Sequence, residues 1–214
     1  MRKQITISEE GNNMGILYTI GHSTFEISNL VNNLKKYNIN YLLDVRSMPY
    51  SRFAPQYNKS ELERELKKHN IKYFYMGKFF GARQLDRTFY PNGYIDFSVY
   101  RKSDLFLKGK TSVLRGLKEY NIALMCTEKN PIECHRTIMI ARDFEVSDVK
   151  VMHILHDGKL KSQEEISNEL LERFFPDRHQ VSLFNEENKD INWYLDEAYK
   201  KQNELIGYRI GEEE

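Results

Sequence analysis

Cysteine, tryptophan and proline are scarce in this chain of 214 residues, which holds two, one and five of them respectively. Two cysteines, Cys126 and Cys134, cannot build the disulfide framework of a small secreted domain. Neither a Cys-x-x-Cys pair nor the spacing of a structural zinc finger occurs. The sequence therefore predicts reduced thiols whose role is reactive, metal-binding or simply one of packing.

Long apolar runs and nucleotide motifs are also missing. No stretch approaches 18 apolar residues, and the run Ile16–Ile20 is too short for a signal peptide. We therefore expect a cytoplasmic protein that does not enter a membrane. The glycine-rich loops of dinucleotide and NTP sites are absent. A cysteine-phosphatase loop is excluded because Ile132 and Ile140 stand six residues after the two candidate positions, where an arginine is required.

The net charge is only +1, which indicates no general affinity for nucleic acid, but the charge is unevenly spread. Residues 46–87 contain ten Lys or Arg against four Asp or Glu, a net charge of +6, whereas residues 161–214 contain seven against fourteen, a net charge of −7. Solvated helix faces would explain both segments. The alternative is a basic patch that attracts an anionic substrate and an acidic C-terminal segment.

Short apolar runs alternate with segments of helical periodicity. The expected strands are 16–20, 41–45, 72–76, 122–126 and 149–155, and the expected helices are 25–37, 59–70, 97–120 (interrupted near Gly109), 134–144 and 162–175. This alternation predicts an α/β fold, namely a Rossmann-like three-layer domain with a mostly parallel five-stranded sheet and helices on both faces. Residues 1–14 are expected to form a flexible arm, residues 15–175 the domain, and residues 176–214 an acidic, helical C-terminal extension that docks or binds a partner.

Polar residues follow the strands at their carboxyl ends, where open α/β sheets bind ligands. They are Gly21, His22 and Ser23 after the first strand, Asp44, Arg46, Ser47 and Arg52 after the second, and Cys126 and Glu128 at the fourth, followed by Cys134, His135 and Arg136. This convergence predicts a site at one edge of the sheet.

Several of these residues also have a purely structural interpretation. Asp44 can simply pair with Arg46 or Arg52, and Ser23 can cap the next helix. His153 lies inside an apolar run, which favours a hydrogen-bonded core histidine. Cys134 is expected in the first turn of a helix, where the helix dipole and the neighbouring Arg136 would favour the thiolate.

The combined motifs resemble the family called domain of unknown function 488 (DUF488). They are Tyr-Thr-Ile-Gly-His-Ser at 18–23, Asp-Val-Arg-Ser-x-Pro-x-Ser-Arg at 44–52, Phe80-Gly81, Leu-Met-Cys-x-Glu at 124–128, Cys-His-Arg at 134–136 and Val-x-His-Ile at 151–154. The resemblance implies a compact α/β fold with a shared polar site but assigns no reaction. The family pattern continues with a second glycine after Gly81, where this chain has Ala82.

Three hypotheses for function remain open at this point. The first is an enzyme, a hydrolase or transferase acting on an anionic substrate that is phosphate-bearing, nucleotide-like or related to nucleic acid. Its catalytic residues would be Glu128, His22, Asp44, Cys134 and His135, and its substrate-binding residues Gly21, Ser23, Arg46, Ser47, Arg52, Gly81 and Arg136. The second is a metal-binding or thiol redox module that uses Cys126 and Cys134. The third is a nucleic-acid-binding module without catalysis. The sequence leaves the cofactor, the substrate and the oligomeric state undetermined.

Overall fold

The computed structural model describes residues 15–178 and 189–211, and six strands of these residues form one sheet in the order β3-β2-β4-β1-β5-β6. The strands are β1 (Leu17–Gly21), β2 (Tyr41–Asp44), β3 (Lys72–Tyr75), β4 (Ile122–Cys126), β5 (Val151–Ile154) and β6 (Leu160–Ser162). The first five run parallel, and β6 pairs antiparallel with β5. The predicted N-terminal arm, residues 1–14, lies outside the described residues.

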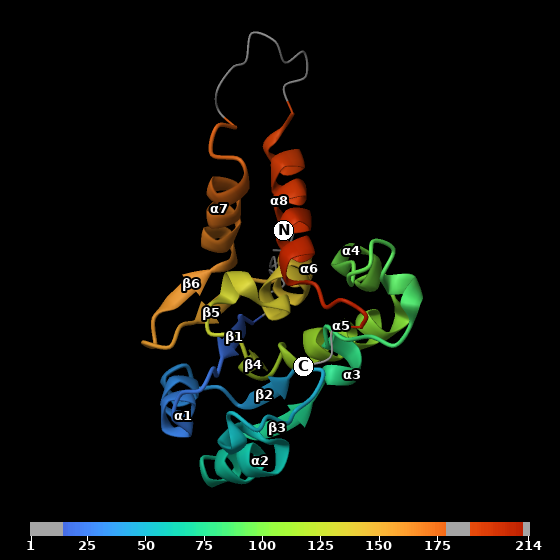
Figure 1. The fold of residues 1–214 in the computed structure, drawn as a ribbon. Coiled ribbons are helices and arrows are strands. Elements are labelled where there is room, and N and C mark those ends of the chain that lie inside the picture. Colours follow the sequence, from blue (N-terminus) through green and yellow to red (C-terminus); the bar gives the residue numbers. More distant parts are fainter. Residues whose placement is uncertain (1–14, 179–188, 212–214) are drawn as a thin grey trace, which may run out of the picture.

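Helices cover both faces of this sheet, so the predicted three layers are present (Figure 1). The longer helices are α1 (Ile27–Lys36), α2 (Lys59–Lys68), α5 (Asp104–Gly116), α7 (Gln163–Phe174) and α8 (Ile191–Ile206), and the short ones are α3 (Gly77–Phe80), α4 (Phe97–Tyr100), the π-helix η4 (Arg136–Ala141) and α6 (Arg142–Glu145). Single 3₁₀ turns are η1 (Pro55–Tyr57), η2 (Arg87–Phe89) and η3 (Pro131–Glu133). Helices α1 and α2 cover one face, and α3 to α8 with η4 pack into the core on the other.

Two features of the sheet differ from the prediction. There are six strands rather than five, because a turn at Gly158 (φ +73°) folds residues 160–162 back onto β5. This strand is only three residues long and leads directly into α7, so it is too short to show the alternating apolar pattern of a strand. The strand order also departs from that of the dinucleotide-binding Rossmann fold, because β4 rather than β1 lies beside β2.

The burial of each strand follows its place in the sheet. All five residues of the central strand β4 are buried, because helices cover both of its faces. Strand β3 lies at the edge and is only half-buried on alternate residues. Side chains alternate between the two faces, so that Leu124 and Cys126 join the core under α5 and η4, while Ala123 and Met125 join the core under α1 and α2.

The helix predicted over residues 97–120 is interrupted at a different point. Ser103 ends the short α4 segment and caps α5 by accepting a hydrogen bond from the backbone N–H of Phe106. Gly109, where the break was expected, lies within α5. A Cβ atom there would come within 2.7 Å of Phe79 Cβ and 2.9 Å of the Phe80 ring. This glycine therefore allows α5 to pack closely on α3 and does not break the helix.

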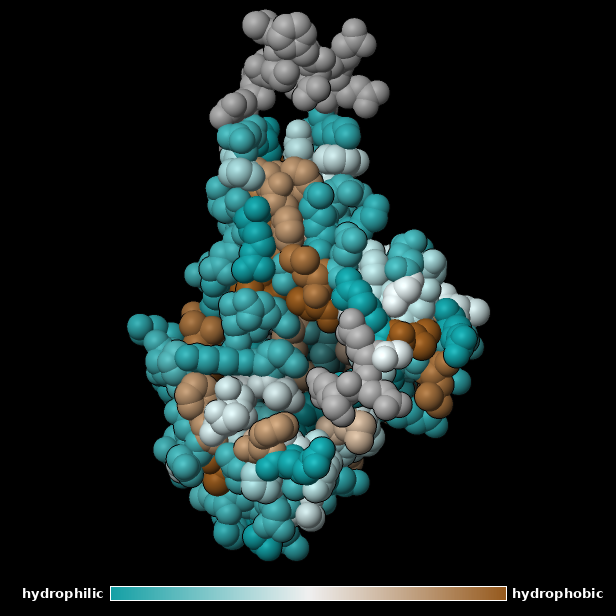
Figure 2. Space-filling view, in the orientation of Figure 1, coloured by the Kyte–Doolittle hydropathy of each residue, from teal (hydrophilic) through white to brown (hydrophobic). Residues whose placement is uncertain are grey.

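The C-terminal extension docks as a helix. In Figure 1, α7 and α8 stand side by side, and Figure 2 shows hydrophobic side chains between them. Ala198 and Tyr199 of α8 are buried in the main core. Asn203 donates to the carbonyl of Ile95 and accepts from the N–H of Phe97, which ties the extension to the segment before α4. Among the described residues, no helix is both long and apolar enough to span a membrane.

A buried chain of hydrogen bonds connects the sheet to this helical pair. His153 on β5 accepts from the hydroxyl of Thr19 at Nδ1 (2.8 Å) and donates from Nε2 to the side-chain oxygen of Gln163 (2.7 Å), whose amide donates to Tyr199 Oη (2.7 Å). These contacts suit the neutral imidazole with its proton on Nε2, because the Gln163 side-chain oxygen can only accept and the Thr19 hydroxyl can donate. Burial lowers the pKa of His153 to about 3. The interpretation of His153 as a hydrogen-bonded core residue is confirmed.

This histidine makes the protein less stable in acid. The unfolded chain protonates His153 near pH 6.5 while the folded chain resists protonation to about pH 3, so the unfolded state binds more protons as the pH falls below 6.5. Lowering the pH from 8 to 5 is expected to remove ~2 kcal/mol of unfolding free energy through this residue alone. Urea denaturation at several pH values measures the slope. H153Q should flatten it, whereas H156Q, at an exposed histidine, should leave it unchanged; an equal slope in both variants would contradict the assignment.

Candidate metal centre

The predicted site residues do gather at the carboxyl ends of the strands, but they form two groups on opposite faces of the sheet. Neighbouring side chains in a strand face opposite sides of the sheet. Leu43 joins the core under α5 and η4, so Asp44, the next residue, faces α1 and α2; His22 follows Gly21 and takes the same face as Asp44. Cys126 faces the other side, under η4. The expectation of one shared group is therefore replaced by two adjacent groups with different chemistry.

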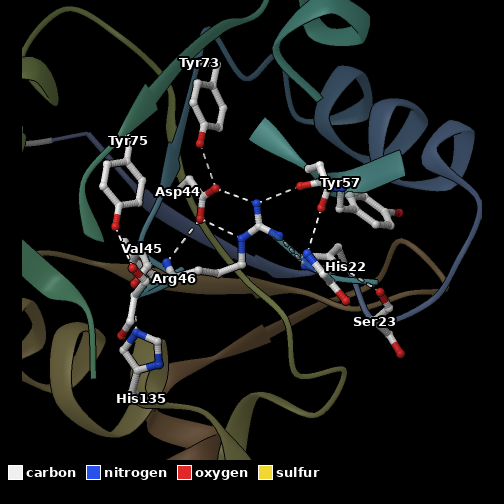
Figure 3. A network of polar contacts seen from close by, with 12 residues as sticks. His22, Ser23, Asp44, Val45, Arg46, Tyr57, Tyr73, Tyr75 and His135 are labelled. Atoms are coloured by element: carbon white, nitrogen blue, oxygen red, sulfur yellow. Dashed lines mark hydrogen bonds and ion pairs between the residues drawn. The ribbon is translucent and has the colours of Figure 1, made fainter. Parts of the chain in front are cut away.

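The first group is centred on a buried ion pair (Figure 3). Arg46 donates from Nε to Asp44 Oδ1 (2.9 Å) and from Nη2 to Oδ2 (2.6 Å), and the same Nη2 donates to the carbonyl of Tyr57 (2.8 Å). Tyr73 donates its hydroxyl to Asp44 Oδ2 (2.8 Å). The forked face of Arg46, predicted to hold an anion, is thus occupied by a carboxylate from its own chain.

His22 completes this group as a neutral imidazole. Its Nδ1 lies 2.6 Å from the carbonyl of Ser23, an acceptor, so Nδ1 carries the proton and Nε2 accepts from Arg46 Nη1 at 3.2 Å. The ring stacks on Tyr57 with centroids 4.0 Å apart. Burial and the charge of Arg46 lower the pKa of His22 to about 4. His22, which the sequence predicts to be catalytic, is therefore held without a transferable proton on Nε2.

The second group brings together four side chains that are typical ligands of a transition metal. Glu128 Oε2 lies 3.0 Å from Cys126 Sγ and 2.8 Å from Cys134 Sγ, and His135 Nδ1 lies 3.6 Å and 4.0 Å from the same two sulfur atoms. One donor atom from each of the four residues lies within 4.8 Å of the others. The two cysteines and the histidine are buried, whereas Glu128 is exposed.

A hydrogen bond from the end of β2 orients His135. Its Nε2 lies 3.1 Å from the carbonyl oxygen of Val45, which can only accept, so Nε2 carries the proton. Nδ1 points toward the two sulfur atoms. Burial opposes a second proton on this ring, but the hydrogen bond with Cys134 raises its pKa above the ordinary value, and a metal bound at Nδ1 would take the place of that proton. Metal-binding histidines are held in this way by a second hydrogen bond that fixes the tautomer and the ring. The arrangement thus supplies an imidazole in the form that a metal requires.

Arg136 is a buried cation beside these ligands. Its side chain is 1% exposed, donates to the carbonyl of Glu128 (2.7 Å), and leaves Nε without a hydrogen-bond partner among the described residues. Gly21 makes room for this contact, because a Cβ atom at that position would come within 1.9 Å of the Glu128 carbonyl. None of the ion pairs in the described part of the chain includes Arg136, and its positive charge lowers the pKa of both nearby thiols.

The two thiols differ in acidity. Burial and the neighbouring Cys134 raise the pKa of Cys126. Burial also opposes ionisation of Cys134, but its hydrogen bond with Cys126 and the positive charge of Arg136 bring the pKa of that thiol below its ordinary value. Cys134 precedes η4 by two residues and lies outside its first turn, which corrects the prediction. Its thiolate is stabilised by these neighbouring groups.

The Glu128 residue as a whole is exposed, but its carboxyl group lies against the two sulfur atoms, and loss of water around that group raises its pKa; the negative charge of Cys134 raises it further. Three acidic side chains therefore lie close together, and a cation bound among them would stabilise their ionised forms.

The remaining predicted residues lie around these groups. Ser23 adopts a left-handed conformation (φ 49°) and caps no helix, since α1 begins after Glu26. Ser47 accepts from the backbone N–H of Arg83 and lies against Gly81, where a Cβ would come within 2.8 Å of the serine hydroxyl. Arg52 is exposed on the loop after β2. The roles proposed for these residues stay predictions.

Two important contributors were missed by the sequence analysis. The carbonyl of Val45 orients His135, and Tyr57 closes the pocket of Arg46 and His22. A backbone carbonyl leaves no sequence signal. Tyr57 lies shortly after Pro55 in a long loop. The one sequence signal for its burial is that it is an aromatic residue between polar neighbours.

Comparison with known proteins yields one finding. Searches of curated proteins and of solved structures give no match. The family described as "Domain of unknown function DUF488" matches residues 26–142, more than half of the chain, including Cys126, Glu128, Cys134 and His135. His22 and the motif around His153 lie outside the matched segment. On this match, together with the motifs at its strand ends, the chain belongs to the DUF488 family.

Proposed function

We propose that this protein holds one transition-metal ion, of the zinc or iron class, with Cys126, Cys134, His135 and Glu128. The observation that carries the proposal is the close approach of two sulfurs, one imidazole nitrogen and one carboxylate oxygen, all within 4.8 Å of one another. Thiolate and imidazole ligands suit these metals, and four-coordinate sites are their usual arrangement. The hydrogen bond from His135 to Val45 supports it further, because that bond leaves Nδ1 free to bind metal.

The balance of charge also supports a bound cation. Two thiolates and one carboxylate carry three negative charges in a largely buried place, and Arg136 supplies one positive charge. A divalent metal ion would bring the group to neutrality. Without a metal, one ionised group such as the Cys134 thiolate is enough to balance Arg136, so the remaining acidic groups must keep their protons, because additional unpaired buried charge would be costly.

A catalytic role fits this centre better than a structural one. The described domain already has an extensive apolar core on both faces of its sheet, so it does not need a metal to fold. The centre lies at the carboxyl edge of parallel strands, where α/β enzymes bind substrates. Glu128 is its exposed member. We propose that Cys126, Cys134 and His135 are the permanent ligands. Glu128 would dissociate from the metal so that water or an anionic substrate could bind in its place, and would then act as general base.

Metal analysis tests the centre directly. Protein purified without chelators is expected to contain about one metal ion per chain by elemental mass spectrometry, and cobalt substitution should give sulfur-to-metal charge-transfer absorption. H135Q should weaken metal affinity at least ~100-fold because it removes a ligand. The matched control H156Q changes an exposed histidine and should bind like the native chain. Native chain that takes up no metal under these conditions would refute the proposed centre.

A second prediction concerns Gly21, which contacts the centre without being a ligand. G21A would force a Cβ atom against the backbone of Glu128, so the carboxylate must move away from the sulfurs. We expect ~10-fold weaker metal binding and a loss of ~1–3 kcal/mol in unfolding free energy. In the control G116A, the new Cβ meets the terminal methyl group of Ile122 and no backbone atom, so metal affinity should stay close to native and the loss of stability should be smaller than in G21A. Calorimetric metal titration and urea denaturation measure them.

A third prediction separates a catalytic centre from a structural one. If Glu128 yields its position, azide added to the cobalt-substituted protein should bind the metal and shift its visible absorption, and E128Q should bind azide more tightly. A closed structural site offers no such position. If azide left the visible absorption of both proteins unchanged, the metal centre would still stand, but the catalytic assignment would be rejected.

A further inference from the structure

The loop between β2 and α2 exposes three large apolar side chains to solvent. The exposed fractions are 62% for Met48, 62% for Tyr50 and 90% for Phe53. Exposed apolar groups gathered in one short segment usually mark an interaction site, because single exposed apolar residues are ordinary but clusters are costly. None of these three residues takes part in the metal centre proposed above.

The exposure comes from a loop that is held in place. Asn58 accepts from the N–H of Ser51 (2.7 Å), and the Ser51 hydroxyl accepts from the N–H groups of Phe53 and Ala54. Ala54 and Tyr57 are buried and fix the loop to the core under α1 and α2. Hydrogen bonds and buried anchors therefore hold the loop in a conformation that directs the large apolar side chains outward. The loop is prepared for contact at little cost in conformational entropy.

Positive charge surrounds the same loop. Arg52 lies between Tyr50 and Phe53, Lys59 begins α2, and Lys78 lies on α3; all three cations are exposed. Within the described ranges, none of the three forms an ion pair. Lys59 instead lies 5.9 Å from the centre of the Tyr75 ring.

The segment after α3 continues this surface. The backbone N–H of Arg83 donates to Ser47 Oγ (2.9 Å), so the two segments touch at the base of the loop, as the position of α3 beside the end of β2 in Figure 1 also indicates. Two residues further on, Leu85 is fully exposed. The result is a surface of exposed rings and unpaired cations at the carboxyl edge of the sheet.

We propose that this surface, formed by Met48, Tyr50, Arg52, Phe53, Lys59 and Lys78, binds single-stranded nucleic acid. Unpaired bases stack on exposed aromatic rings, and the phosphates between them are held by lysine and arginine. The presence of exposed rings together with exposed cations favours this ligand over an acidic protein segment, because a single strand offers bases to the rings and phosphates to the cations, whereas acidic side chains would contact the cations alone. A duplex hides its bases and would lose the stacking contribution.

Fluorescence anisotropy with labelled 10-nucleotide DNA and RNA single strands tests the proposal on the full chain. We expect binding that weakens steeply as salt is raised, and weaker binding to a duplex of the same length. The double variant Y50A/F53A should bind the single strands at least ~10-fold more weakly, since each stacked base is lost with its ring. R52Q should reduce the slope of log affinity against log salt concentration by the amount that corresponds to about one phosphate contact.

Substitutions near the amino-terminal ends of β2 and β4, away from the loop at the carboxyl edge, provide the control. Arg115 in α5 and Tyr120, which precedes β4 and is 41% exposed, offer the same residue types away from the loop, so R115Q/Y120A should bind like the native chain. Equal affinity of native chain and Y50A/F53A, or equal loss in the control, would overturn the proposal. The assay is run with metal-loaded and chelator-treated protein. Loss of binding in Y50A/F53A alone under both conditions supports this surface whatever the metal analysis shows.

Discussion

The buried ion pair between Asp44 and Arg46 is the constraint on which the carboxyl edge of the sheet depends. A buried charge must be paired, and removing one partner of such a pair costs on the order of 3–5 kcal/mol. Here the pair also holds the carbonyl of Tyr57 and the imidazole of His22, so one interaction fixes the end of β2, the following loop and the end of β1. Between the two charged residues stands Val45, whose carbonyl accepts from His135. The ion pair on one face of the sheet thereby helps to position, through Val45, the imidazole that we propose as a metal ligand on the other face.

The order of the strands explains why these groups meet. With β4 between β2 and β1, the end of β4 is flanked by Asp44 and Gly21, and Cys126 is surrounded on both sides by neighbouring backbone. The absence of a side chain at Gly21 lets the Glu128 carbonyl and Arg136 approach. Side-chain alternation then sorts the polar residues, so the ion pair and the sulfur ligands share an edge but do not touch directly.

The C-terminal extension belongs to this arrangement. Gln202 of α8 donates its amide to the carbonyl of Ile132, two residues before Cys134, and Tyr199 ends the hydrogen-bonded chain that begins at Thr19. The segment that carries the proposed metal ligands thus packs against the sheet and is also hydrogen-bonded to α8, a helix that is distant in sequence. The proposed nucleic-acid surface belongs to the same carboxyl edge of the sheet, because its loop follows β2 and contacts the segment after α3 through Ser47 and Arg83.

Local patterns in the sequence were sufficient for most elements of the fold. Strand β4 was predicted with its observed bounds, and the helix predicted over residues 162–175 begins where Ser162 and Glu165 form a capping box, because both patterns arise between residues that are near neighbours in the chain. The core role of His153 also followed from its apolar neighbours. Tertiary structure decided the rest. Whether Asp44 faces a ligand or Arg46, whether Gly109 breaks or packs a helix, and whether Cys126, Glu128, Cys134 and His135 converge depends on strand order and on which face each side chain takes. A linear sequence does not state these distances, because they are set only when the sheet is assembled.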